Sequence, residues 1–288
     1  MEYNQLLNSG ISWLEIFNII EDFHDFKKRI CLRELSESFT QDQIEVYLKR
    51  LELDQYNEPH ILAEAYYLFG LLADPLLDKK KYFEEIQCLS ELFEQKLQQK
   101  GDSIYQLHER LDRQRLIVFG KKHIRDVAES CVEALNELLF EDHMLIPESS
   151  SFFNLDSHRV DKLLSASSKG IPLSLSSLYV IIAQKSGLPI FGVNMPRHFL
   201  VKWHYQGIEF FINPYNFGEV IRKESVYQLL SQDEVPLNPK QLEPASYRTI
   251  IRRALTNLIP LFKKEPGSEK DAFIQRLIKL ISNSSNYQ

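Results

Sequence analysis

Residues 170–218 contain the pattern that most constrains how this chain can fold. The segment opens with Gly170 and Pro172, continues as an apolar run, and reaches Gly187 and Pro189. Pro172 suits a first helical turn because its missing N–H needs no partner there, and glycine followed by proline ends a helix. Apolar residues between these points recur at intervals of three and four, which predicts one buried helix face: Leu175, Leu178, Tyr179, Ile182 and Ala183.

Two short runs after this helix have the composition of β-strands. Residues 199–203 and 208–212 are rich in β-branched and aromatic side chains, and Gln206 with Gly207 between them suits a hairpin turn. His198 comes directly before the first run, and Asn213 directly after the second. The segment therefore predicts a helix and two paired strands, with a histidine and an amide at strand ends.

This order of elements resembles that of the papain-like and transglutaminase-like fold. In that fold a cysteine at the helix N-terminus is the nucleophile, a histidine is its base, and an aspartate or asparagine orients the histidine. The order suits the chemistry, because a helix dipole and a nearby imidazole lower the pKa of a thiol. The third residue fixes the tautomer of the imidazole.

The motifs resemble those of one branch, the bacterial SirB-type transglutaminase-like proteins. The resemblance covers residues 62–218, and its motifs are GIPLSL at 170–175, GLP at 187–189, PRHFLV at 196–201 and FINPYN at 211–216. It implies an α+β fold that is mostly helical around a small antiparallel sheet. By this resemblance we expect a helical N-terminal region over 1–142, the transglutaminase-like core over 143–232 and a tetratricopeptide-like helical tail over 233–288.

The resemblance places a vestigial triad at Pro172, His198 and Asn213. Proline stands where the nucleophilic cysteine would be, as is common in SirB-type proteins, and it cannot attack a carbonyl. Arg197 in place of glycine and Asn213 in place of aspartate are further departures from the family pattern. We therefore assign a catalytic role to no residue. Ser176 is a weak nucleophile candidate, because it shares the helix face of Pro172 about 6 Å further along the axis, whereas Ser174 lies about 200° around the helix.

Four residues are candidates for binding: Arg197, His198, Tyr215 and Asn216. Arg197 either holds a carboxylate or phosphate or is solvated, and Tyr215, Asn216 and Phe217 either line the cleft or close the strand. His198 is a structural histidine, a ligand contact or a residual acid–base group. With His204 it supplies too few ligands for a metal, and we recognise no cysteine or acidic cluster that joins them. We expect no metal and no cofactor.

Charge and composition bear on partners and compartment. A net charge of −6 over 288 residues disfavours a nucleic-acid partner. The three cysteines show no paired spacing, as is typical of a reducing cytosol. We see no secretory signal and no apolar run near the ~20 residues of a membrane span. We therefore expect a cytoplasmic protein with a protein partner, no nucleic acid and no membrane span.

Helical periodicity extends over most of the remaining chain. Helices are expected over 3–24, 40–53, 59–72, 78–97, 103–116, 123–140, 225–230, 245–263 and 269–282, with residues 143–169 the least regular. The leading hypothesis is a non-catalytic interaction or ligand-binding module. The alternatives are an atypical hydrolase or transamidase that uses His198 and Asn213 with Ser176 or a bound water, and a structural subunit of an assembly.

Overall fold

The computed structural model describes residues 58–74, 77–101, 121–149, 152–205, 207–232, 239–262 and 269–283, together with Gln41, Ile44, Glu45 and Leu48. The helices expected over 3–24 and 103–116 lie outside the described residues, as does most of the helix expected over 40–53. Everything stated below about contacts concerns the described residues.

The helices expected over 59–72, 78–97 and 123–140 are present, with one change of type. α4 spans Pro59–Ala73 and has its proline in the first turn. α5 spans Lys79–Gln99 and is capped by Asp78, whose carboxylate accepts the Lys81 N–H at 3.1 Å. α7 spans Lys121–Asn136 and continues as a π-helix, η2, over Glu137–Asp142. The expected helix over 123–140 therefore changes its hydrogen-bond pattern after Asn136, a feature often found near functional sites.

The region over 143–169 contains short elements that periodicity did not reveal. Its pieces are β1 (Ile146–Pro147), η3 (Leu155–His158), α8 (Val160–Leu163) and β2 (Lys169–Gly170). β1 and β2 pair in parallel, and β2 leads directly into α9, which spans Pro172–Lys185. Gly187 follows α9 with a positive φ of 79°, as expected for a glycine that ends a helix.

The main sheet has four antiparallel strands in the order β3-β4-β5-β6. β4 (Phe199–Tyr205) and β5 (Ile208–Asn213) confirm the expected hairpin, with Tyr205 opposite Ile208. The sequence analysis did not predict β3 (Ile190–Asn194) and β6 (Glu219–Ile221). Both are short, and β3 has a glycine at its centre, which lowers β-propensity. The result confirms the α+β class with a small antiparallel sheet.

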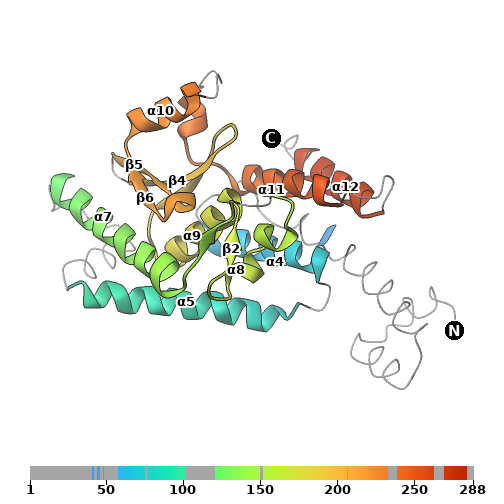
Figure 1. The fold of residues 1–288 in the computed structure, drawn as a ribbon, viewed down its shortest axis with the longest axis horizontal. Coiled ribbons are helices and arrows are strands. Elements are labelled where there is room, and N and C mark those ends of the chain that lie inside the picture. The colour runs from blue at the N-terminus through green and yellow to red at the C-terminus, as the bar shows by residue number, and fades with distance from the viewer. Residues whose placement is uncertain are drawn as a thin grey trace.

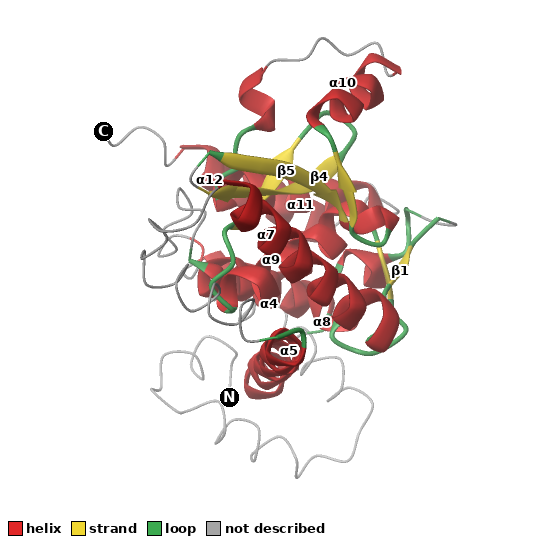
Figure 2. Cartoon of the chain, turned by 90° about the vertical axis from the view of Figure 1, so that its left-hand side faces the viewer, coloured by secondary structure: helices red, strands yellow, loops and turns green. Residues whose placement is uncertain are grey.

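Helices cover both faces of this sheet, as Figures 1 and 2 show. α9 packs against β3 and β4, with α4, α5 and α7 around it, and together they enclose the large core. Phe199, Val201 and Trp203 point into that core from alternate positions of β4. On the opposite face α10 (Lys223–Gln232) and η5 (Pro239–Leu242) cover a smaller cluster that includes Leu200 and Phe211.

The C-terminal helices form a pair that packs on the core. α11 spans Tyr247–Phe262, α12 spans Glu269–Asn283, and both contribute buried residues to the large core. The Tyr247 hydroxyl donates to Gln184 Oε1 at 2.5 Å, and the Ala245 N–H donates to the Gly192 carbonyl at 2.9 Å. These contacts seat α11 against α9 and against β3. None of the helices in the described ranges combines the length and apolar character needed to cross a bilayer.

Candidate functional site

The first turn of α9 places Pro172 at the position that the family resemblance assigned to the nucleophile. Ile171 precedes it in an extended conformation and gives the helix no side-chain cap. The Ile171 N–H donates to the Ser157 carbonyl at 3.1 Å, which ties the start of α9 to η3. Pro172 is half-buried and carries no donor, acceptor or ionisable side-chain group. The helix therefore begins without a nucleophile at its first position.

The hydroxyls next to Pro172 are buried and already donate hydrogen bonds to the main chain. Ser174 Oγ donates to the Ser157 carbonyl at 2.6 Å, and Ser176 Oγ donates to the Phe199 carbonyl at 3.3 Å. Ser176 is 0% exposed, between α9 and β4. Its hydroxyl joins the helix to the residue after His198, which is a packing role.

The described cysteines do not belong to α9. Cys131 is buried in α7, and burial raises the pKa of its thiol to about 12. A thiol with so high a pKa carries almost no thiolate near neutral pH and is a poor nucleophile. Cys88 is exposed on α5.

The loop between β3 and β4 presents Arg197 and His198. Arg197 is exposed and has a φ of 59°, in the left-handed region that few non-glycine residues adopt. The His198 N–H donates to the Pro196 carbonyl at 2.7 Å, which closes a tight turn around Arg197. His198 is half-buried. This short connection turns the Arg197 side chain toward solvent directly beside the candidate histidine.

Asn213 begins the turn that follows β5. Its side-chain oxygen accepts the Tyr215 N–H at 3.1 Å and so caps the short helix η4 (Pro214–Asn216). The Tyr215 hydroxyl donates to the Glu148 carbonyl at 2.6 Å, and the exposed Asn216 amide donates to Glu219 at 2.6 Å. Phe217 then adopts a left-handed φ of 51° and is 55% exposed. The side-chain oxygen of Asn213 thus serves the local turn.

Strand register brings the two loops to the same end of the sheet. Val201 lies opposite Ile212 in the antiparallel β4–β5 pair, so the residues before β4 and those after β5 are neighbours. The resemblance-derived positions His198 and Asn213 are therefore gathered at one edge. The turn after β5 also contributes the exposed aromatic ring of Phe217.

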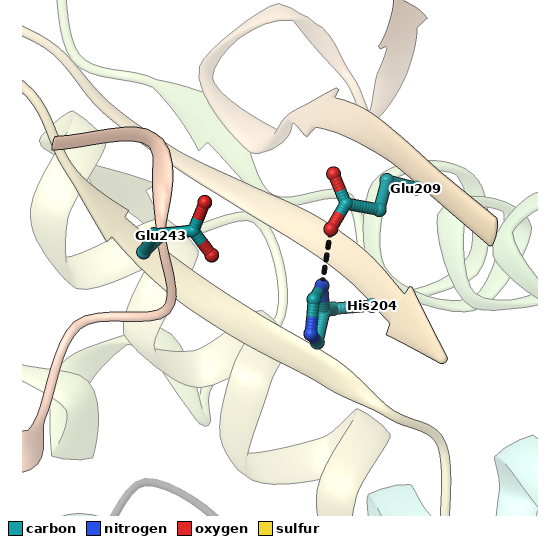
Figure 3. Close-up of side chains that lie close together, drawn as sticks. All are labelled: His204, Glu209 and Glu243. Carbon is teal, nitrogen blue, oxygen red and sulfur yellow. Dashed lines mark ion pairs between the residues drawn. The ribbon is translucent and has the colours of Figure 1, made fainter. Parts of the chain in front are cut away.

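A second polar cluster lies at the other end of the β4–β5 hairpin (Figure 3). His204 Nδ1 is 2.6 Å from Glu209 Oε1, and Glu243 lies close to both, with the ligand-type atoms of all three within 4.8 Å of one another. Buried Lys202 places its ammonium 3.5 Å from Glu209 and 3.7 Å from Glu243 and donates to the Leu242 carbonyl at 3.0 Å. The register of the hairpin, which pairs His204 with Glu209, is the sequence signal that would have revealed this carboxylate beside His204.

Lys202 decides how this cluster is interpreted. Its side chain is only 1% exposed, so its positive charge is held among the carboxylates with little solvent screening. A divalent cation placed among His204, Glu209 and Glu243 would lie close to that ammonium and be repelled by it. We therefore describe the cluster as an ion-pair network and assign no metal to it.

Glu209 gives this network a pH dependence. Partial burial raises the pKa of Glu209, but its interactions with Lys202 and His204 outweigh burial and leave the pKa below its ordinary value. A depressed carboxyl pKa stabilises the fold above the pKa of the unfolded chain, and that stability is lost as pH falls through the folded pKa. We expect Glu209→Gln to lower the free energy of unfolding at pH 7 by about 1 kcal/mol or less, since the carboxylate is 35% exposed.

The loss of unfolding free energy caused by Glu209→Gln should shrink as pH falls below about 4. There the wild-type carboxylate takes up a proton and becomes neutral, like the glutamine amide. Urea unfolding of both proteins at several pH values measures it. Glu243→Gln is the matched control and should have a smaller effect, because Glu243 is 59% exposed. A difference between wild type and Glu209→Gln that stays constant from pH 7 to pH 3 would contradict this account.

A cavity beside the start of α9 is too small to bind a ligand. Its lining includes Ser174, and its volume is about 10 Å³, whereas one water needs roughly 10–15 Å³. Its walls come from α4, η3, α9 and α11, with these residues: Tyr66, Phe69, Leu72, Leu155, His158, Arg159, Ile171, Leu173, Ser174, Ala254 and Leu258.

The α9 helix and the antiparallel sheet against which it packs are consistent with an α+β transglutaminase-like fold. The family model of the transglutaminase-like superfamily matches residues 80–256. The chain therefore belongs to this superfamily. The matched range starts in α5 and ends in α11, so it includes both candidate loops.

Curated relatives match a central part of the chain. A UPF0162 protein of Vibrio cholerae is 29% identical over 140 residues, covering 47% of this chain and 51% of the relative. A UPF0162 protein of Xylella fastidiosa is 30% identical over 121 residues, covering 40% of this chain and 43% of the relative. F-box only protein 21 of Homo sapiens is 24% identical over 149 residues, covering 49% of this chain and 23% of the relative. The chain thus spans about half the length of the first relatives or less, and no solved structure matches it.

Proposed function

We propose that this chain is a non-catalytic member of the superfamily that works as a protein-interaction or ligand-binding module. The observation that carries the proposal is Pro172 at the first position of α9, where the enzymes of this fold carry their nucleophile. Ser174 and Ser176 do not replace it, because both hydroxyls are buried and donate to main-chain carbonyls. An attack on a carbonyl needs an accessible nucleophile within reach of a base.

The two loops at the sheet edge supply the proposed binding surface. Arg197 and Asn216 are exposed, Phe217 exposes an aromatic ring, and His198 and Tyr215 are half-buried beside them in the chain. An arginine forms bidentate hydrogen bonds with carboxylates, and aromatic and arginine side chains are enriched at protein interfaces. The chemistry favours a protein partner that offers an acidic group next to an apolar side chain.

Finer assignments follow from the same proposal. Within the superfamily we place the chain in the SirB-type branch, with α11 and α12 as its tetratricopeptide-like tail and with regions over 1–142, 143–232 and 233–288. We also propose a bacterial, cytoplasmic protein that has no nucleic-acid partner. The UPF0162 relatives from Vibrio cholerae and Xylella fastidiosa support the bacterial origin, and the net charge of −6 supports the exclusion of nucleic acid.

The first test of the proposal is catalytic. Wild type, His198→Ala and Ser176→Ala are assayed for amine incorporation into a glutamine-donor protein and for hydrolysis of activated esters and amides. We expect the three proteins to give the same background rate, because His198 has no accessible nucleophile to activate. Turnover that disappears in His198→Ala while the melting temperature stays unchanged would establish the atypical hydrolase or transamidase instead.

The second test addresses binding. A photo-crosslinking benzoylphenylalanine replaces Phe217 at the proposed surface, and the same residue replaces Leu92, which is 42% exposed on α5, as the matched control. We expect a discrete crosslinked protein from position 217 only, and its loss when Arg197→Glu is added. Identical products from both positions, or a product that is insensitive to Arg197→Glu, would contradict the proposed surface.

A further inference from the structure

Arg253 on α11 contacts the loop that carries Arg197 and His198 at three points. Its Nη1 atom donates to Asn194 Oδ1 at 2.6 Å, to the Met195 carbonyl at 2.7 Å and to the His198 carbonyl at 2.9 Å. These acceptors belong to the last residue of β3, the first residue of the loop and the last residue of the loop. One guanidinium therefore bridges both ends of the connection between the two strands.

The guanidinium of Arg253 also contacts an aromatic ring. Its central carbon lies 5.6 Å from the centre of the Phe199 ring, within the range of a cation–π contact. The side chain is partly buried, which strengthens hydrogen bonds to it relative to those made in water. Since β4 begins at Phe199, Arg253 contacts the whole connection from the end of one strand to the start of the next.

The loop also has main-chain contacts of its own. Asn194 and Phe199 pair at its base in the β3–β4 ladder, and the His198 N–H donates to the Pro196 carbonyl. Arg197 stands in a left-handed conformation that is unfavourable for a non-glycine residue. Such a conformation persists only where surrounding contacts over-determine it, and the three bonds from α11 are contacts of that kind.

We propose that Arg253 is the positioning residue of this loop, so that the C-terminal helix pair controls how Arg197 and His198 are presented. The binding role of those two residues rests on the function proposed above, whereas the positioning role does not depend on it. When α11 is seated by Tyr247 on α9, the loop is held. When α11 moves away, the three acceptors lose their shared donor and the loop opens.

Limited trypsin digestion measures this opening without knowledge of the partner. Trypsin cleaves after Arg197 only when the loop leaves its folded conformation, and the cleavage rate tracks the open population. Arg253→Met keeps the aliphatic packing and removes the donors. We expect cleavage after Arg197 to accelerate about tenfold or more, because a hydrogen bond to a charged group is lost. Arg253→Lys, which keeps a charged donor, should give an intermediate rate.

Two internal comparisons separate local opening from general loss of stability. Cleavage after Lys81, on exposed α5, should keep its wild-type rate in Arg253→Met if only the loop opens. Arg252→Met is the matched control, because Arg252 is the exposed neighbour on the same helix, and its rate of cleavage after Arg197 should stay within about twofold of wild type.

The histidine resonances give an independent readout. In labelled protein, the imidazole signals of His198 should shift or broaden in Arg253→Met and keep their wild-type positions in Arg252→Met. If Arg253→Met does not fold, Asn194→Ala removes one acceptor from the loop side and should still accelerate cleavage after Arg197. Unchanged cleavage in these variants, or an equal acceleration after Lys81, would overturn the proposal and leave the proposed binding function untouched.

Discussion

Replacing Asp161 by alanine is expected to lower the free energy of unfolding by about 3–5 kcal/mol, the cost of breaking a buried ion pair by removing one partner. The Asp161 carboxylate accepts two hydrogen bonds from Arg159, from Nε at 3.1 Å and from Nη2 at 2.6 Å. The side chains are only 4% and 7% exposed, respectively. Without Asp161 the guanidinium keeps its charge in a buried position with its two best partners gone.

The carboxylate also fits tightly against α4. A Cβ built on Gly70 would lie 2.9 Å from Asp161 Oδ1, so the helix backbone approaches the pair closely at this glycine. The pair is therefore enclosed against α4, which restricts its access to solvent. This restriction is why we place the expected loss at the level of a buried pair rather than a surface one.

Urea or thermal unfolding measures the effect of Asp161→Ala, and two variants interpret it. Asp156→Ala removes the other carboxylate near Arg159, 3.5 Å away and 61% exposed, and should cost less than about 1 kcal/mol. Adding Arg159→Met to Asp161→Ala removes the stranded charge and should recover much of the loss. A cost below about 1 kcal/mol for Asp161→Ala would contradict this account, because it would show that water solvates the Arg159 guanidinium in the variant.

Gly218→Ala is expected to be the second most damaging substitution, at about 2–4 kcal/mol. Gly218 has a φ of 76°, and a Cβ there would lie 1.8 Å from Asn136 Oδ1. Two hydrogen bonds hold Asn136 in place: its amide donates to the Gly218 carbonyl at 2.9 Å, and its oxygen accepts from the Tyr179 hydroxyl at 2.9 Å. The added methyl must break this bridge between α7, α9 and the turn after η4.

Denaturant unfolding with two reference variants separates the causes. Gly101→Ala adds a methyl at a positive φ where nothing lies within 4 Å, so it reports the backbone cost alone. Asn136→Ala together with Gly218→Ala removes the clash, and the double variant should lose less than the sum of the single losses. Simple additivity would mean that Asn136 moves aside freely and that the bridge contributes little.

The sequence predicted the central elements well because their signals are local. Pro172 and Gly187 bound α9, and the β4–β5 hairpin follows from strand composition on both sides of Gly207. Signals of this kind depend on neighbours within a few residues. β3, β6 and the β1–β2 pair were not predicted, since they are two to five residues long and become strands only through partners elsewhere in the chain.

The candidate site was likewise predicted only in the part that depends on the order of residues along the chain. The resemblance placed Pro172, His198 and Asn213 in order along the chain, and strand register then explains why positions 198 and 213 meet at one sheet edge. The resemblance gave no indication of the side chains that hold the two loops. Arg253 lies 55 residues from the His198 carbonyl that it binds, and Asn136 lies 82 residues from the Gly218 carbonyl.

By itself the sequence determined that position 172 carries no nucleophilic group, because a proline side chain has none in any conformation. It also determined the helix and the hairpin that surround that position. The tertiary structure alone decided that Ser176 is buried against β4, that Lys202 stands among carboxylates and that α7 and α11 hold the two loops. These properties depend on burial and on contacts between distant segments, which are created only when the helices pack on the sheet.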